Sequence, residues 1–221
     1  MSEYTANYQA SANGLSATAT RSLTKLGDNS YRLRNSLEAS LAGQSLARLD
    51  QSSEFELQGE RVVPLNYSYL LSGVSRASHA IVYNWDAKLA LSSEDEESWQ
   101  LQLSEGVMDQ LSYQTALRQL LLANRDALSS FAFQIIDGDG IDRHEYRVVG
   151  REIISTPLGA LNTLKLERVR AASDDRVTEI WLAEDWGFLI ARLEQLNSSG
   201  LRIVMELKSA EIGGEAVSAI N

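Results

Sequence analysis

Residues 31–41 read YRLRNSLEASL, and this stretch decides the fold class. One face of an extended chain here carries the apolar side chains Tyr31, Leu33, Leu37, Ala39 and Leu41. The opposite face carries Arg32, Arg34, Ser36, Glu38 and Ser40. A period of two predicts a β-strand with one buried and one solvated face, as in an antiparallel sheet.

The same period extends in both directions along the chain. Residues 4–10 and 15–19 alternate around Asn13-Gly14, a pair that favours a hairpin turn because both residues tolerate positive φ. Further strands are predicted at 44–57, 79–85, 99–103, 131–135, 143–154, 160–170, 176–183, 187–196 and 200–208. Residues 59–75, with Pro64 and Gly73, are less regular, and we expect a connector there. The pattern predicts about ten or eleven strands in hairpin succession.

Residues 107–124 follow a different period. Their apolar side chains recur at intervals of three and four, which predicts an amphipathic helix. Asp109 is expected in its first turn and Arg125 at its other end, where each charge suits the helix dipole.

A chain of 221 residues fits one large β domain. We expect residues 1–209 to be mainly β: one long antiparallel sheet that curls, or forms an incomplete β-barrel, because strand twist accumulates. The helix would cover the concave apolar face. Residues 210–221 are small and weakly patterned, and a loose C-terminal tail is expected.

Composition excludes several classes of function. The net charge is −10, which opposes binding to nucleic acid and docking on anionic lipid head groups. There is no cysteine, so disulfides, thiolate nucleophiles and cysteine-ligated zinc are excluded. Apolar runs stay shorter than the roughly 18 residues of a membrane-spanning helix, so no transmembrane segment is expected.

One acidic segment could hold a metal ion. Asp137, Asp139 and Asp142 lie within six residues, a spacing at which carboxylate oxygens can bind calcium. The Asp-Gly pairs of this segment also form hairpin turns without metal, and the predicted flanking strands favour the turn. The histidines give no metal-binding spacing: His79 falls on a predicted strand face, and His144 is expected to be exposed near the turn.

No catalytic motif is complete. Gly73-Val74-Ser75 lacks the second glycine of a nucleophile elbow. Gly138 and Gly140 lack the third glycine of a dinucleotide-binding loop. We therefore expect neither an enzyme nor a cofactor.

Aromatic and leucine side chains suggest an apolar binding surface inside the curl. The candidates are Tyr83, Trp85, Leu111, Leu117 and Trp181. Aromatic walls commonly receive acyl chains or other apolar ligands. Ordinary core packing explains the same pattern, and the sequence leaves both interpretations open.

Several segments resemble a bacterial family known as domain of unknown function 3108. Tyr4 to Gly14 (YTANYQASANG) is similar to its opening strand and turn. The other matching segments are Asp109 to Leu117, Thr156-Pro157-Leu158-Gly159 and Ile180 to Asp185. The ordered set covers about residues 3–208, and Ile190-Ala191 stands where many relatives have a proline before Arg192.

The resemblance implies an exported envelope protein with a fold similar to lipoprotein carriers. We expect a periplasmic location, with the signal peptide presumed removed from this chain. The expected function is non-catalytic binding of an apolar ligand, a lipid or acyl chain, on the concave face. The alternative is a structural or protein-interaction module of the envelope whose partner is another envelope protein.

Overall fold

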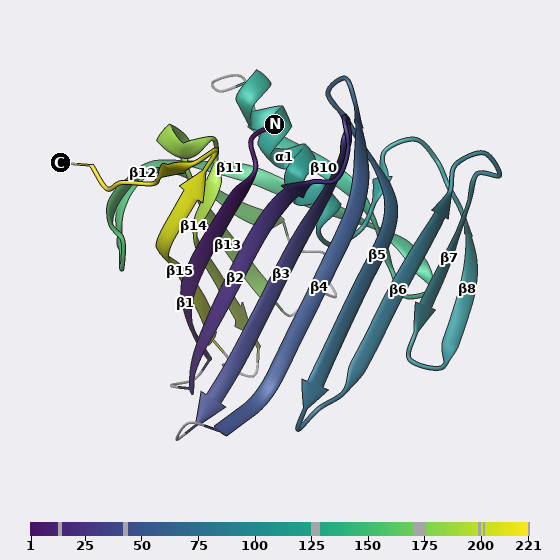
Figure 1. Ribbon diagram of the computed structural model, residues 1–221, viewed down its shortest axis with the longest axis horizontal. Helices are drawn as coiled ribbons and strands as arrows, with labels where there is room; N and C mark the ends of the chain where they lie inside the picture. The colour runs from purple at the N-terminus through teal and green to yellow at the C-terminus, as the bar shows by residue number, and fades with distance from the viewer. Residues whose placement is uncertain are drawn as a thin grey trace.

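The computed structural model describes all residues except 13–14, 42–43, 125–128, 170–175, 199, 201 and 221. In the described residues, sixteen strands form one sheet, with the helix α1 (Ser112–Ala123) and a short 3₁₀ helix, η1 (Glu184–Trp186) (Figure 1). The first strands are β1 (Tyr4–Ala12), β2 (Leu15–Lys25), β3 (Ser30–Leu41), β4 (Gln44–Gln58), β5 (Arg61–Gly73), β6 (Ala77–Asn84), β7 (Leu89–Glu94) and β8 (Glu97–Gln102). The remaining strands are β9 (Val107–Met108), β10 (Ser130–Asp137), β11 (Gly140–Thr156), β12 (Gly159–Val169), β13 (Arg176–Ala183), β14 (Leu189–Asn197), β15 (Arg202–Ile212) and β16 (Glu215–Ala216).

Two meanders make up the sheet, and they join at β1 and β15. In space, β8 to β1 follow one another in reverse chain order, and β15 to β9 continue beyond β1. Neighbouring strands pair antiparallel except β9 and β10, which pair parallel. β8 and β9 are consecutive in the chain but stand at opposite ends of the sheet.

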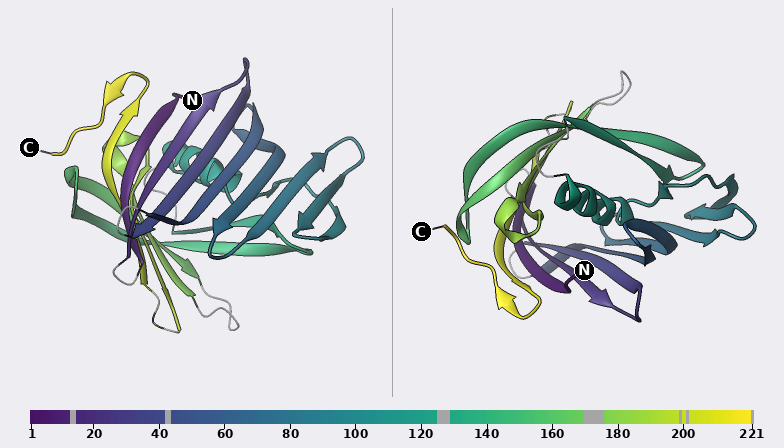
Figure 2. Two further views of the ribbon diagram at one scale, coloured as in Figure 1. Left: turned by 60° about the horizontal axis from the view of Figure 1, so that its bottom comes forward. Right: turned by 90° about the horizontal axis from the view of Figure 1, so that it is seen from above.

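The sheet curls around α1, which lies inside the curl (Figure 2). This confirms the predicted mainly β fold with a curled sheet and one main helix. The alternation sets the two faces of the curl: inward side chains such as Tyr4, Leu23 and Leu33 are buried, whereas outward neighbours such as Thr5 and Arg34 stay exposed.

The prediction of ten or eleven strands was wrong, since the sheet has sixteen. The predicted connector at 59–75 contains β5, which pairs with β4 over nearly its whole length. Pro64 is accommodated at a bulge, where Phe55 faces Pro64 and Glu54 faces Asn66, so that Leu65 has no partner. A bulge tolerates proline because ladder hydrogen bonds are interrupted there.

The helix is shorter than the predicted 107–124. Val107 and Met108 form β9 against Gln134 and Ile135 of β10, and α1 begins at Ser112. Asp109 precedes the first turn instead of lying in it. Its Oδ1 accepts hydrogen bonds from the backbone N–H groups of Leu111 and Ser112, each at 2.8 Å. The predicted partner charge, Arg125, lies outside the described residues.

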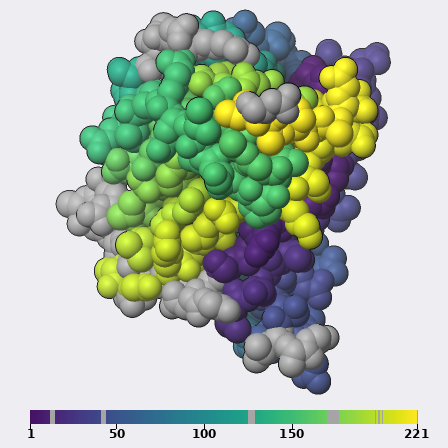
Figure 3. All heavy atoms as spheres, turned by 90° about the vertical axis from the view of Figure 1, so that its left-hand side faces the viewer, coloured from purple at the N-terminus to yellow at the C-terminus, as the bar shows by residue number. Residues whose placement is uncertain are grey.

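The predicted loose tail is also corrected. β15 continues to Ile212, and β16 turns back to pair with it. Beyond β16, Val217 is buried and its N–H donates to the carbonyl of Ala210, while the N–H of Ile220 donates to that of Ala160. The C-terminal segment therefore packs against β15 and β12 on the surface, and Figure 3 shows it in yellow next to the green strands.

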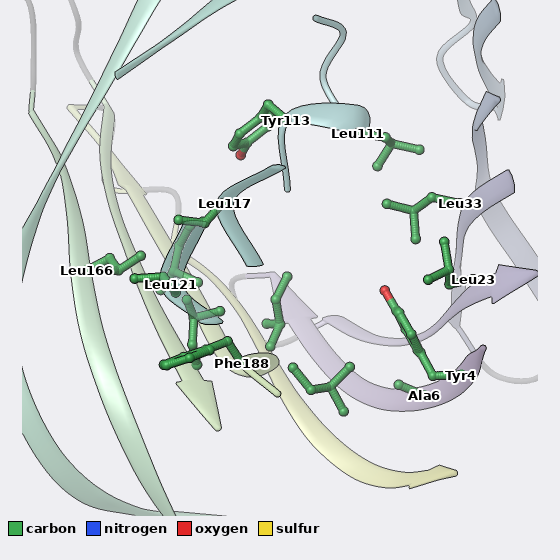
Figure 4. Packing of buried hydrophobic residues seen from close by; sticks show 14 of the residues in the cluster. Tyr4, Ala6, Leu23, Leu33, Leu111, Tyr113, Leu117, Leu121, Leu166 and Phe188 are labelled. Atoms are coloured by element: carbon green, nitrogen blue, oxygen red, sulfur yellow. The ribbon is translucent and has the colours of Figure 1, made fainter. Parts of the chain in front are cut away.

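The core fills the space between the helix and the surrounding walls. Leu111, just before α1, and Leu117 and Leu121 of α1 lie between Leu33 on one side and Phe188 on the other (Figure 4). These side chains are at most 3% exposed, so the interior at the level of the helix is closed by the protein's own residues.

Candidate functional site

A solvent-open cavity of about 650 Å³ adjoins the helix and the inner face of the sheet. Its wall is drawn from strands of both meanders, from β1 to β7 on one side and from β10 to β15 on the other. Gln110, just before α1, and Tyr113 and Gln114 in its first turn also line the cavity. A volume of this size is typical of sites for small molecules, which range over about 300–1,000 Å³.

One part of the wall is apolar. It contains Leu37, Leu49, Leu193, Ile203 and Met205, which lie on β3, β4, β14 and β15. Four of the five are only half-buried, whereas Met205 is buried. These strands therefore expose apolar side chains to the hollow instead of burying them against one another.

A second part of the wall, the cationic pole, consists of Arg21, Tyr113, Gln114 and Arg168. Arg21 Nη2 donates to Oε1 of Gln114 at 2.6 Å. The Tyr146 hydroxyl donates to the Tyr113 hydroxyl at 3.0 Å, and the two rings stack. Burial raises the pKa of Tyr113, and the charges of Arg21 and Arg168 oppose that rise. Both guanidinium groups therefore act on the same phenol.

A third part, the acidic pole, consists of His79, Glu94 and Asp137. Burial lowers the pKa of His79, while the carboxylates of Asp137 and Glu94 oppose the decrease. His79 Nε2 lies 3.2 Å from Oγ of Ser92, and that hydroxyl donates to the carbonyl of Gly138 at 2.6 Å. The Ser92 proton is thus held by a backbone carbonyl and not by the imidazole.

The predicted binding residues divide between the core and a separate cleft. Leu111 is fully buried, and Leu117 packs in the core between the walls (Figure 4). Tyr83 is buried and stacks on Trp85 with ring centroids 5.8 Å apart. Trp85 lines a smaller apolar cleft of about 230 Å³ between α1 and β5, and its Nε1 donates to the carbonyl of Pro64 at 2.7 Å.

Trp181 lies on the outer face of the sheet, which corrects its predicted place inside the curl. Its neighbour Ile180 lines the cavity, and side chains alternate along a strand. On the outer face, Lys165 Nζ and Arg192 Cζ lie 4.7 and 5.2 Å from the centre of its ring, and Glu152 accepts its Nε1–H. Charged side chains cover this tryptophan, which explains its burial.

The other candidate sites also have defined places. Asp137 and Gly140 close the β10–β11 hairpin, with Gly138 at a φ of 56°, so the acidic segment forms the turn that its glycines favour. In the part of the chain that the structure describes, no three His, Asp or Glu side chains converge as a metal site. His144 is 4% exposed, so its predicted exposure was wrong: it lies inward on β11, two residues from Tyr146.

The sequence interpretation missed the polar poles of the cavity. Arg21 offered a detectable signal, because it shares a strand face with Ala17, Ala19 and Leu23. A charge at an inward position of an alternating strand is costly to bury and indicates a special role. The acidic pole gave no such signal, since Asp137 on β10 is far in the sequence from the cross-strand pair of His79 and Glu94 on β6 and β7.

None of the described helices is long and apolar enough to cross a membrane.

Comparisons with known proteins concern the fold and the family. The family model described as "Protein of unknown function (DUF3108)" matches residues 3–208. A β-barrel-like protein of domain of unknown function DUF1849 from Brucella abortus superposes with a TM-score of 0.60 at 8% identity, covering 96% of this chain and 98% of the other. A putative exported protein with a YmcC-like fold from Bacteroides fragilis gives a TM-score of 0.42 at 11% identity, covering 94% and 95%. No curated protein matches the chain.

Proposed function

The chain belongs to the DUF3108 family, and from this premise we propose that it is a non-catalytic binding protein of the bacterial cell envelope, which holds an acyl chain or similar lipid in the cavity of its curled sheet. The periplasm is the proposed location. The family resemblance to exported proteins motivates this part of the proposal, and fractionation of cells that express the complete gene product tests it.

The cavity carries the proposal. A hollow of about 650 Å³ with half-buried Leu37, Leu49, Leu193 and Ile203 in its wall leaves apolar surface that a ligand would remove from water. Each Å² of apolar surface removed from water contributes about 25 cal/mol. An acyl chain in the hollow would thus be bound favourably, and its binding would also raise the free energy of unfolding of the protein.

Binding is favoured over catalysis by the chemistry of the acidic pole. A nucleophilic serine must give its proton to a base. Ser92 instead donates to the carbonyl of Gly138, and the serine is fully buried. This histidine and serine therefore hold the strands together and do not form a catalytic pair.

Binding of lipids is tested by native mass spectrometry of delipidated protein incubated with a bacterial lipid extract. The variant Ile203→Asp places a charge in the apolar wall and should weaken lipid binding at least tenfold. Ile153→Asp is the matched control, because Ile153 is 64% exposed. Absence of any bound lipid on the wild-type protein, or unchanged binding by Ile203→Asp, would contradict the proposal.

A second candidate function is protein interaction at the free sheet edge. β8 pairs only with β7 in the described residues, so its other side can accept an added strand. A stoichiometric envelope partner whose binding is lost on Gln100→Pro, in a protein that takes up no lipid, would favour this function.

A further inference from the structure

Arg21 is a buried cation among apolar neighbours. It is 5% exposed, and the next inward residues on β2, Ala19 and Leu23, are 3% and 2% exposed. A guanidinium carries five N–H donors and stays charged at every physiological pH. Burying such a group costs free energy unless an anion or several acceptors surround it.

The protein supplies little of that compensation. The hydrogen bond of Arg21 goes to a neutral amide oxygen, that of Gln114, and no carboxylate of the described residues forms an ion pair with it. Arginines on the outer face, by contrast, form ion pairs with carboxylates: Arg32 pairs with Glu54, and Arg147 pairs with Glu167. The interior guanidinium thus retains donors for a partner that the described chain does not provide.

The surroundings of Arg21 suit an oxyanion. Arg21 lines the cavity beside Tyr113, whose oxygen accepts the hydrogen bond from Tyr146 and whose own hydroxyl proton remains available as a donor. Arg168 lines the same cavity and adds positive charge near this phenol. Donors and charge therefore converge at the cationic pole.

The rest of the cavity fixes the orientation of a ligand. Glu94 and Asp137 at the acidic pole repel an anion. Leu49, Leu193 and Ile203 offer apolar surface and no charge. An anion that carries an apolar chain satisfies both the cationic pole and the apolar wall.

We infer that the ligand of the proposed site is an anionic amphiphile, and that Arg21 binds its carboxylate or phosphate head group. This inference rests on the proposed function and specifies the class of ligand. Hydrogen bonds to charged groups contribute more than neutral ones, enough for about a tenfold to hundredfold preference over an uncharged analogue.

Equilibrium dialysis with four labelled probes tests the inference: laurate, lauryl phosphate, lauryl alcohol and inorganic phosphate. We expect wild-type protein to bind laurate or lauryl phosphate at least tenfold more tightly than lauryl alcohol. Arg21→Met should abolish this preference and leave binding of the alcohol unchanged. Arg147→Met removes the same charge from the outer face and should keep the preference.

Folding of the variants is checked separately. Replacing a buried ion by an apolar side chain of similar size is often neutral or stabilising, so the Tm of Arg21→Met should be at least that of the wild type. Arg21→Lys keeps the charge and should retain part of the preference.

The outcomes separate the two proposals. Equal binding of acid and alcohol by the wild type, or an intact preference in Arg21→Met, overturns the role of Arg21 and leaves lipid binding standing. Inorganic phosphate bound as tightly as lauryl phosphate overturns the need for an apolar chain. Failure of all four probes overturns the proposed function together with the inference.

Discussion

Two buried tyrosine hydroxyl groups inside the curl differ in their hydrogen bonding. The Tyr146 hydroxyl donates to Tyr113, whereas the Tyr8 hydroxyl is buried without a hydrogen-bond partner in the described residues. Leaving a buried polar group unpaired costs about 1–3 kcal/mol, and pairing it contributes about 1 kcal/mol.

The two tyrosines therefore predict opposite effects of the same substitution. Tyr8→Phe should leave the free energy of unfolding unchanged or raise it by about 1 kcal/mol, because an unpaired group is removed. Tyr146→Phe should lower it by about 1 kcal/mol, because a hydrogen bond is lost. Urea unfolding of both variants gives the comparison, and an equal loss in both would contradict the assignment of partners.

Asp109 couples the start of the helix to pH. Burial raises the pKa of this carboxyl, and its hydrogen bonds to Ser112, Leu111 and Ser53 oppose the rise. The folded state therefore holds the Asp109 proton more tightly than the unfolded state does. The stability that this group contributes is present below its unfolded pKa and is lost as the pH rises through its folded pKa.

Asp109→Asn should remove this pH dependence. The free energy of unfolding of the wild type should fall relative to that of the variant as the pH rises above 4. The fall should be about 1.4 kcal/mol for each pH unit between the unfolded and the folded pKa of Asp109. Thermal unfolding at several pH values measures it, with Asp86→Asn in an exposed turn as the control. A difference that grows with pH would show that burial does not govern this carboxyl.

At the scale of elements, the end of β5 depends on a close approach of two backbones. Gly73 has a φ of 114°, and a Cβ at this position would overlap the carbonyl oxygen of Leu46 and lie 2.8 Å from Cα of Ala47. The N–H of Val74 donates to that same carbonyl at 3.1 Å. A side chain here would force β4 and β5 apart.

Gly73→Ala should therefore cost about 3 kcal/mol or more, since steric overlap adds to backbone strain. Gly140→Ala is the control, because a Cβ at this position would have no atom within 4 Å and the φ of Gly140 is not in the left-handed region. In chemical denaturation, the midpoint of Gly73→Ala should lie well below that of Gly140→Ala. Similar midpoints would mean that the strands can separate at little cost.

Elements with clean alternation were predictable from the sequence, whereas those fixed by distant partners were not. The strand pattern of residues 31–41 is realised in β3, because one face meets the core and the other meets water. β5 escaped prediction because Pro64 interrupts its pattern, and the bulge that admits the proline involves a pairing with β4. Val107 and Met108 fit a helical period equally well, and their parallel pairing with β10 decides their structure.

The candidate site was less predictable than the fold. The concave hollow follows from strand twist, and the sequence predicts it. The identity of its lining does not, because both faces of a strand can carry buried apolar side chains, and the sequence does not say which face points inward. On β13, Ile180 and Leu182 point inward, so Trp181 between them lies outside although it is also buried.

At the scale of the whole molecule, the C-terminal segment closes one side of the fold. The Trp186 Nε1–H donates to the carbonyl of Ser218, and Ile220 bonds to Ala160 of β12. These contacts connect residues after β16 to η1 and to β12.

Hydrogen exchange should reveal this attachment. The amides of Val217 and Ile220 should exchange at least tenfold more slowly than that of Ala219, because each of the two donates to a backbone carbonyl. Deletion of residues 213–221 should lower the free energy of unfolding by about 2–4 kcal/mol through loss of these bonds and of buried Val217. Fast exchange at all three amides would contradict the observed packing.

The pairing of β1 with β15 imposes an order on synthesis. Asn7 and Ser209 contact each other across 202 positions of sequence. β1 therefore cannot form this pairing until β15 has been synthesised. Until then, the nascent chain presents an unpaired strand edge, which is the kind of surface that aggregates. Contacts this distant in sequence are expected to make folding slow. A chaperone that shields the unpaired edge until β15 is synthesised should therefore increase the yield of folded protein.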